Sequence, residues 1–185
     1  MSRILTALAL AACTLTLAAE DFGPAVKAAN QIYQGRTHFG VACDTRYSQK
    51  DVADLQRALP DGTTLTVVDV RHPAHVGGAA SVMVMRGVEL MALLPHDPLI
   101  RDGSFHATVL VDQVQRSNIP AFGTTSAALK NGCAFALGAG TNWELAINPK
   151  LLDPSILGTV GPVEVTRTPW ETPKGPSNLT WIPRN

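Results

Sequence analysis

A histidine and a carboxylate stand side by side where a short apolar run stops. The run covers residues 88–94 and ends at Pro95, after which His96 and Asp97 precede Pro98. An imidazole and a carboxylate at such a point could be catalysts, metal ligands or ligand-binding groups, or they could simply form a polar turn. Neighbouring side chains on an extended chain point to opposite sides, so His96 and Asp97 do not form an acid–base pair with each other.

Polar side chains also follow the other predicted strands. In an open parallel sheet, ligands bind at the edge formed by the carboxyl ends of the strands. A helix starting near Ser126 would add free backbone N–H groups to this edge. Turns recruit Asp, Thr, Ser and Pro for conformational reasons alone, which is the alternative explanation. The candidate ligand-binding residues are Asp44, Thr45, His72, His96, Asp97, Thr124, Thr125 and Ser126.

Strands and helices alternate along the chain. Strands are predicted at residues 37–43, 64–70, 88–94, 119–123 and 133–137. Helices are predicted at residues 25–34, 48–59, 74–86 and 126–130, and in a segment that starts at Ser104. The second helix has an N-terminal signal in Ser48 and Asp51, and Ser104 is the expected cap of its own helix. In that helix Ala107, Leu110, Val111 and Val114 are expected to share one buried face.

Apolar strands that alternate with helices are typical of a parallel sheet covered on both faces. The pattern predicts a three-layer α/β domain with a mostly parallel, five-stranded sheet in a flavodoxin-like layout. Residues 143–147 and 162–166 are predicted as further strands, with a C-terminal hairpin. The domain is expected to cover residues 20–168, and residues 169–185 form an irregular tail with four prolines.

The N-terminus has the pattern of a secretory signal. Arg3 precedes an apolar stretch at residues 4–17, and Ala19 ends the segment, so residues 1–19 are predicted to be removed on export to the periplasm. Leu10-Ala11-Ala12-Cys13 also resembles a lipoprotein signal, with Cys13 as the lipidated residue. The 15 basic and 15 acidic residues give no net charge, which provides no electrostatic reason to expect a nucleic-acid partner.

Enzyme motifs are absent from the sequence. It has no Gly-x-Ser-x-Gly elbow and no phosphate-binding loop, so we expect neither catalysis nor a cofactor. Metal binding is a separate alternative, because His72 and His75 could converge with the Cys43-Asp44 and His96-Asp97 pairs on zinc or copper. Cys43 and Cys133 are otherwise expected to be unpaired core residues.

Three segments resemble successive blocks of a known family. "FGVACDTRYSQKDVADLQRAL", "VELMALLPHDPLIRDG" and "NIPAFGTTSAALKNGCAFALG" look like parts of the tryptophan/tyrosine-type substrate-binding proteins of ABC transporters. Asp97, Thr124, Ser126 and Gly132 fall on matching positions, and the similarity spans residues 37–138. The resemblance implies a non-enzymatic protein that binds a small molecule such as an amino acid. Those proteins close two lobes on the ligand, whereas this chain has one, which would bind weakly without a homodimer or another partner.

A later segment resembles a second family. "KNGCAFALGAGTNWELAIN" is similar to the end of the YfiR-like periplasmic regulators, whose glycine-led strand leads into a hairpin that here would end at 143–148. The family's usual double-leucine helix is not clear in "PKLLDPSILGTVGPVEV". This resemblance implies regulation through contact with a membrane protein, a membrane-bound diguanylate cyclase, instead of ligand transport.

Overall fold

The structure is a computed structural model that describes residues 22–138, 143–158 and 165–169. The predicted signal segment, Cys13 and the tail beyond residue 169 lie outside these ranges. Within them, no helix combines the length and the apolar character that crossing a membrane requires.

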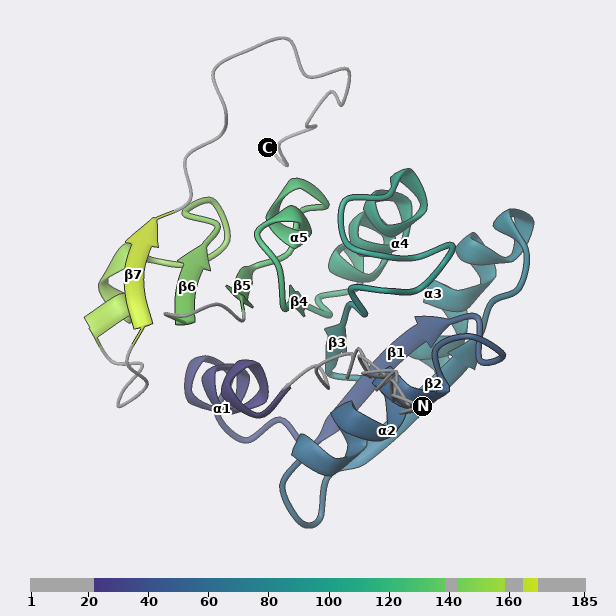
Figure 1. Cartoon of the computed structure of the whole chain (residues 1–185), viewed down its shortest axis with the longest axis horizontal. Helices are drawn as coiled ribbons and strands as arrows, with labels where there is room; N and C mark the ends of the chain where they lie inside the picture. Colours follow the sequence, from purple (N-terminus) through teal and green to yellow (C-terminus); the bar gives the residue numbers. More distant parts are fainter. Residues whose placement is uncertain (1–21, 139–142, 159–164, 170–185) are drawn as a thin grey trace, which may run out of the picture.

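The strands form one seven-stranded sheet in the order β2-β1-β3-β4-β5-β6-β7 (Figure 1). Strands β1 to β5 run parallel, β6 is antiparallel to β5, and β7 is parallel to β6. The order of the first five confirms the flavodoxin-like layout, and the antiparallel β5–β6 pair is the predicted hairpin. The strands are β1 (His38–Cys43), β2 (Thr64–Asp69), β3 (Leu90–Ala92), β4 (Ala121–Gly123), β5 (Phe135–Gly138), β6 (Trp143–Ile147) and β7 (Val165–Pro169).

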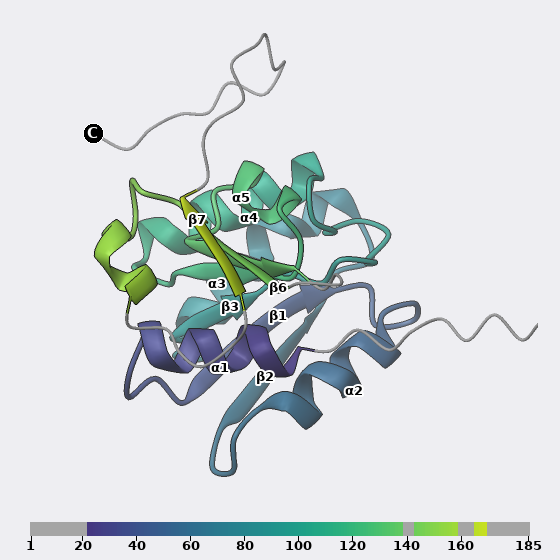
Figure 2. The same cartoon turned by 60° about the vertical axis from the view of Figure 1, so that its left-hand side comes forward.

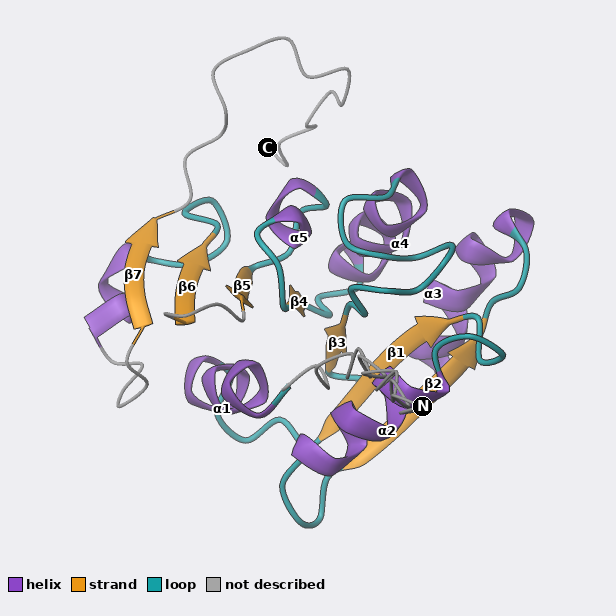
Figure 3. Cartoon of the chain, in the orientation of Figure 1, coloured by secondary structure: helices purple, strands orange, loops and turns teal. Residues whose placement is uncertain are grey.

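Helices cover both faces of this sheet (Figures 1 and 2). Helices α1 (Gly23–Ile32) and α2 (Gln49–Ala58) pack on one face. The opposite face carries α3 (Val76–Met85), α4 (Phe105–Arg116) and α5 (Ala127–Lys130). Two 3-10 turns, η1 (Pro73–His75) and η2 (Pro154–Gly158), complete the described elements. The strands thus lie between two helical layers (Figure 3).

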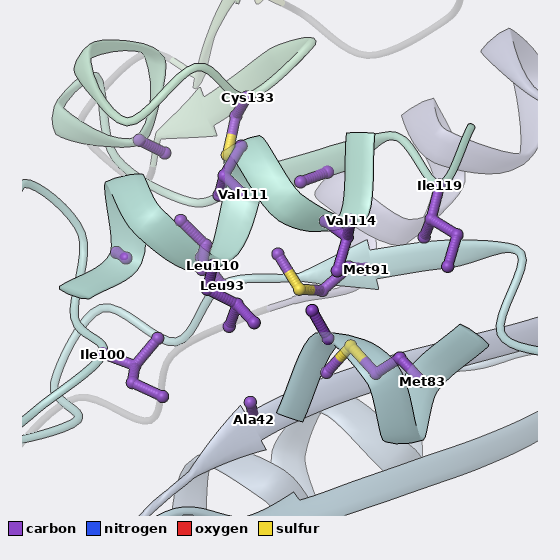
Figure 4. Close-up of a cluster of buried hydrophobic side chains, with 14 of the residues drawn as sticks. Ala42, Met83, Met91, Leu93, Ile100, Leu110, Val111, Val114, Ile119 and Cys133 are labelled. Carbon is purple, nitrogen blue, oxygen red and sulfur yellow. The ribbon is translucent and has the colours of Figure 1, made fainter. Parts of the chain in front are cut away.

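The core is divided by the sheet into two apolar clusters. The cluster under α3 and α4 holds Met83, Met91 and Leu110 among its buried side chains (Figure 4). The cluster under α1 and α2 is richer in aromatic rings, including Phe39 and Phe122 at 6.2 Å between ring centroids. The inner strands β1, β3, β4 and β5 are therefore buried on both sides, which explains their continuous apolar runs in the sequence, whereas the edge strand β2 is only partly buried.

The predicted helix faces and caps fit the structure with one exception. Ala107, Leu110, Val111 and Val114 are all buried on α4, and the Ser104 hydroxyl accepts a hydrogen bond from the Ala107 N–H at 3.1 Å. That helix forms as predicted. The N-terminus of α2 is placed as predicted, with Ser48 at the N-cap position, but the Ser48 hydroxyl makes no capping hydrogen bond and bonds to Asp97 instead.

The predicted helix at residues 74–86 is divided in the structure. Its first turn is the 3-10 turn η1, and the α-helix α3 starts only at Val76. Pro73 fits the first turn of a helix, and it also restricts the residue before it to an extended backbone. The predicted strands at residues 88–94 and 119–123 are longer than β3 and β4. Buried apolar residues continue on either side of the residues that pair with neighbouring strands, so the apolar run is longer than the strand.

Cys43 and Cys133 are free and buried, as predicted. They belong to the two different clusters, on opposite faces of the sheet. Burial raises the pKa of the Cys43 thiol to about 12 and that of the Cys133 thiol well above its usual value. The raised pKa values favour the protonated thiols at neutral pH, and a thiol is less nucleophilic than a thiolate.

Candidate functional site

The loops that follow β1, β2, β3 and β4 lie at one edge of the sheet. We call this edge the rim, and it comprises residues 44–48, 70–72, 93–104 and 124–126. Its existence follows from the parallel pairing of these four strands, which aligns their carboxyl ends. The predicted candidate residues of all four strands accordingly stand at the same edge.

Asp97 is the most buried polar group of the rim, with none of its surface exposed. One carboxylate oxygen accepts the Asp44 N–H and the Ser48 hydroxyl, each at 2.7 Å. The other accepts the N–H groups of Leu99 at 2.9 Å and Ile100 at 2.6 Å. The Asp97 carboxylate thus connects the loop after β1 to the turn after β3, in which Asp97 itself lies. Its hydrogen-bonding capacity is directed at the protein and not at the solvent.

Asp44 and Thr45 make the next connections along the rim. The Asp44 carboxylate forms a two-pronged ion pair with Arg46, with Nε at 2.9 Å and Nη2 at 2.6 Å. Thr45 donates its N–H (3.1 Å) and its hydroxyl (2.8 Å) to one oxygen of Asp69 at the end of β2. Arg71 pairs with the other Asp69 oxygen at 2.7 Å. These contacts join the loop after β1 to the end of β2.

A third carboxylate joins the loops after β3 and β4. Asp102 accepts the Thr125 N–H at 3.2 Å and the Thr125 hydroxyl at 2.7 Å. Beside it, the buried amide of Asn131 accepts the Gly103 N–H and donates to the Ser104 carbonyl at 2.8 Å. The start of α4 and the start of α5 are therefore fixed relative to each other.

Asp69, Asp97 and Asp102 form a series that we call the carboxylate clamps. Each accepts hydrogen bonds from the loop of a neighbouring strand, and together they link four adjacent strand ends. The sequence pattern indicated Asp97 as a ligand-binding residue and Ser48 only as a helix start, and it did not indicate Asp69 or Asp102. The only sequence signal for Asp69 and Asp102 was their place just after a strand or before a helix, which many structural aspartates share.

Exposed groups on the rim remain available to a ligand. The His96 side chain is 62% exposed, and its Nδ1 lies 3.3 Å from a carboxylate oxygen of Asp51 on α2. Tyr47 is 70% exposed, with the Arg46 guanidinium 5.4 Å from the centre of its ring. Ser126 is exposed at the start of α5. These exposed polar and aromatic groups lie on the rim, in the loop after β1, the turn after β3 and the start of α5.

Thr124 differs from the other candidates because it is buried and unpaired. It is 2% exposed, and its hydroxyl has no hydrogen-bond partner among the residues that the structure describes. The predicted anion site at the start of α5 is weak, since this helix is a single turn from Ala127 to Lys130. Because α5 is so short, Thr124 and Ser126 are the residues at the end of β4 whose role in ligand binding is to be tested.

His72 is the candidate that the structure does not connect to the rest. Its ring is exposed and lies 5.9 Å from that of His75, centroid to centroid. In the described ranges, no group of three or more His, Cys, Asp or Glu side chains is placed to hold a metal ion. The convergence predicted for His72, His75, the Cys43-Asp44 pair and the His96-Asp97 pair is therefore not found there, because Asp44 and Asp97 bind protein donors and Cys43 is buried.

The charged contacts of the rim make the stability of the protein depend on acid pH. Hydrogen bonds from the Arg46 side chain hold the pKa of Asp44 below its usual 3.8, and the Thr45 hydroxyl does the same for the pKa of Asp69. The unfolded chain then binds protons at a higher pH than the folded chain, so stability is present above about pH 3.8 and is lost as the pH falls through the folded pKa values.

We therefore expect the urea midpoint to hold between pH 7 and 5 and to fall below about pH 4. The substitution Asp44→Asn removes one of the responsible carboxylates, so the fall between pH 5 and 3 should be smaller in this variant. An equally steep fall in the variant and in the unchanged protein would contradict the role given to Asp44.

Solved structures share this fold at low sequence identity. The chain is similar to the ligand-free, open structure of CD0873, a substrate-binding protein with adhesive properties from Clostridium difficile (TM-score 0.62, 14% identity, covering 83% of this chain and 60% of that one). It is also similar to an ABC domain in complex with L-Trp from Streptococcus pneumonia (TM-score 0.56, 15% identity, 68% and 52%). A conserved domain protein from Vibrio cholerae is a further match (TM-score 0.59, 14% identity, 77% and 58%).

These matches establish a relationship of fold, that of a lobe of ABC-type substrate-binding proteins. The chain spans between 52% and 60% of the length of the three matched structures. No family model and no curated protein matches its sequence. The matches do not show the resemblance to YfiR-like regulators.

Proposed function

We propose that the chain is an exported, non-enzymatic protein that binds a small molecule at the rim. The observation that carries this proposal is the series of carboxylate clamps, which fixes four strand-end loops as one surface. A binding site needs loops held in place before the ligand arrives, because ordering them on binding would cost affinity. Export rests on the predicted signal segment at residues 1–19.

The rim supports binding in preference to catalysis. The carboxylates of all three clamps accept hydrogen bonds from backbone and hydroxyl donors, so none of them is positioned as a free acid or base. The exposed groups are an imidazole, a phenol, a guanidinium and a hydroxyl, and each can hydrogen-bond or stack with a ligand. An amino acid is the first ligand class to test, since one matched structure is in complex with L-Trp.

The described residues form a single lobe, and this bears on how the protein would bind. The rim of one lobe contacts one side of a ligand. A ligand buried on one side only binds weakly, because most small-molecule sites enclose their ligand. We propose that a second protein or a further copy supplies the other side when tight binding is needed, as in a transport-associated component.

Thermal-shift measurements and calorimetry against the twenty amino acids test the proposal. Binding at a hundred-fold excess over Kd would stabilise the fold by about 2.7 kcal/mol and raise Tm. His96→Ala and Tyr47→Ala change exposed rim groups and should each weaken binding about tenfold, while Lys27→Ala, on the exposed side of α1, serves as the control.

Two outcomes would count against this proposal. If no amino acid shifts Tm, the small-ligand function fails, and regulation by contact with a membrane protein, as in the YfiR-like family, becomes the better hypothesis. If a ligand binds and His96→Ala and Tyr47→Ala bind it as tightly as Lys27→Ala does, the site lies away from the rim.

A further inference from the structure

We propose that β2 pairs with β2 of a second copy, so that two sheets join into one across a two-fold axis. β2 is the last strand at one end of the sheet, and β1 is its only neighbour among the described strands (Figure 1). The inference concerns the edge of the sheet and not the rim, so it does not depend on the proposed ligand.

The backbone of β2 has hydrogen-bonding groups directed away from β1. The Thr64 N–H bonds to the Thr37 carbonyl and the Val70 N–H to the Cys43 carbonyl, so the even-numbered residues face β1. Because a strand alternates, the N–H and C=O groups of Leu65, Val67 and Asp69 point to the open side. They form a row of donors and acceptors ready for another strand.

β2 lacks most of the usual protections of an edge strand, and its one charged residue, Asp69, is paired with Arg71. Its sequence, TLTVVD, contains neither lysine nor proline, and its pairing with β1 runs from Thr64 to Asp69 without a bulge. Val67 is an apolar side chain that is 39% exposed. Helix α3 packs on β2, has no charged residue, and exposes Val84 (45%) and Met85 (78%). β2 and the helix packed on it therefore both carry exposed apolar side chains.

A second copy fits this edge better than an unrelated strand because β2 is complementary to itself. In an antiparallel pair with Thr66 on the axis, Leu65 of one copy lies opposite Val67 of the other. Both side chains are on the α1–α2 face, so two apolar cross-strand pairs form. On the α3 face Thr64 lies opposite Val68, which packs against the cluster under α3.

The charges that flank β2 favour the antiparallel direction. Asp61 is exposed in the turn before the strand, and Arg71, whose side chain is 53% exposed, follows it. In an antiparallel pair, the turn that holds Asp61 of one copy approaches the end of β2 that leads into Arg71 of the other, where Arg71 also pairs with Asp69 of its own chain. A parallel arrangement would instead place like charges together. The two rims then point in opposite directions and both stay open to solvent.

Sedimentation velocity on the purified chain, from micromolar to about 100 µM, tests for the pair. We expect a dimer at the higher concentrations. Val67→Pro removes an outward N–H without touching the bonds to β1, and Val67→Lys places two like charges near the axis. Each should raise the dimer Kd at least about tenfold, whereas Val67→Thr keeps the shape and the backbone and should remain dimeric. Circular dichroism confirms that the variants fold.

A cysteine cross-link tests the register. The two Thr66 residues would form a pair without backbone hydrogen bonds, about 4.5 Å apart between Cα atoms, a distance that a disulfide can span. Oxidation of Thr66→Cys with copper–phenanthroline should give a covalent dimer, while Thr64→Cys and the unchanged chain should not. A monomer at every concentration, a dimer unaffected by Val67→Pro and Val67→Lys, or a failure of Thr66→Cys to cross-link would each overturn the proposed pairing.

Discussion

Replacing Asp97 by alanine will lower the free energy of unfolding by about 4 kcal/mol. The substitution removes the acceptor of four hydrogen bonds, from Asp44, Ser48, Leu99 and Ile100. A buried donor left without its acceptor costs about 1 to 3 kcal/mol, and water can reach only some of these positions. Urea denaturation followed by circular dichroism measures the loss.

Asp97→Asn separates the two causes of that loss. The amide keeps the volume of the side chain, so no cavity forms, but its NH₂ group faces protein donors in place of one carboxylate oxygen. We expect Asp97→Asn to lose at least half of what Asp97→Ala loses. A nearly unchanged urea midpoint in the asparagine variant would show that the hydrogen bonds contribute little.

Asp69→Ala is the matched control. It is also a clamp and also accepts two hydrogen bonds from a neighbouring loop, but its side chain is 38% exposed, so water replaces the lost contacts. It should lower the free energy of unfolding far less than Asp97→Ala does. Equal losses in the two variants would contradict the assignment of Asp97 as the buried centre of the rim.

The structural role of Asp97 affects the interpretation of binding measurements on the Asp97→Ala variant. The sequence resemblance to ABC transporter binding proteins suggested Asp97 as a ligand contact, so its loss was expected to abolish binding. In the structure, its loss would also release the loops after β1 and β3. Lost binding in Asp97→Ala therefore does not identify a ligand contact. The exposed His96 and Tyr47 are the more informative positions.

Gly123→Ala should be the most damaging single-atom addition at the rim, at about 3 kcal/mol. A Cβ at this position would lie 2.3 Å from the Ala128 Cβ and 3.2 Å from a carboxylate oxygen of Asp102. Ala128 is fully buried, so α5 has to move as a unit. That movement pulls Thr125 away from Asp102 and opens the clamp between β3 and β4. Urea denaturation of the variant tests this.

Gly78→Ala is the opposite case and serves as the control. Gly78 lies on the exposed side of α3, and a Cβ there has no atom within 4 Å. Alanine is a better helix former than glycine, so we expect a gain of about 0.5 to 1 kcal/mol. If Gly123→Ala were as stable as Gly78→Ala, the close approach of α5 to β4 would not be needed for the fold.

The sequence alone determined the architecture of the sheet. Buried apolar runs separated by helical patterns predicted parallel strands covered on both faces, and the order of the first five strands is the predicted one. The rim followed from that topology, because parallel strands bring their carboxyl ends to one edge. The buried face of α4 and its Ser104 cap also followed from spacing. These features depend on the periodicity of apolar residues, which is determined by residues that are close in the sequence.

Only the tertiary structure decided what the polar residues of the rim do. Ser48 has the sequence of a helix cap, yet its hydroxyl bonds to Asp97, which is 49 positions away along the chain. The Asp102–Thr125 contact spans 23 positions, and the Asp44–Asp97 contact spans 53. Such partners depend on the register between neighbouring strands and on the path of each loop, and no local pattern encodes either. A carboxylate at a strand end therefore looks the same in the sequence whether it will meet a ligand or a backbone N–H group.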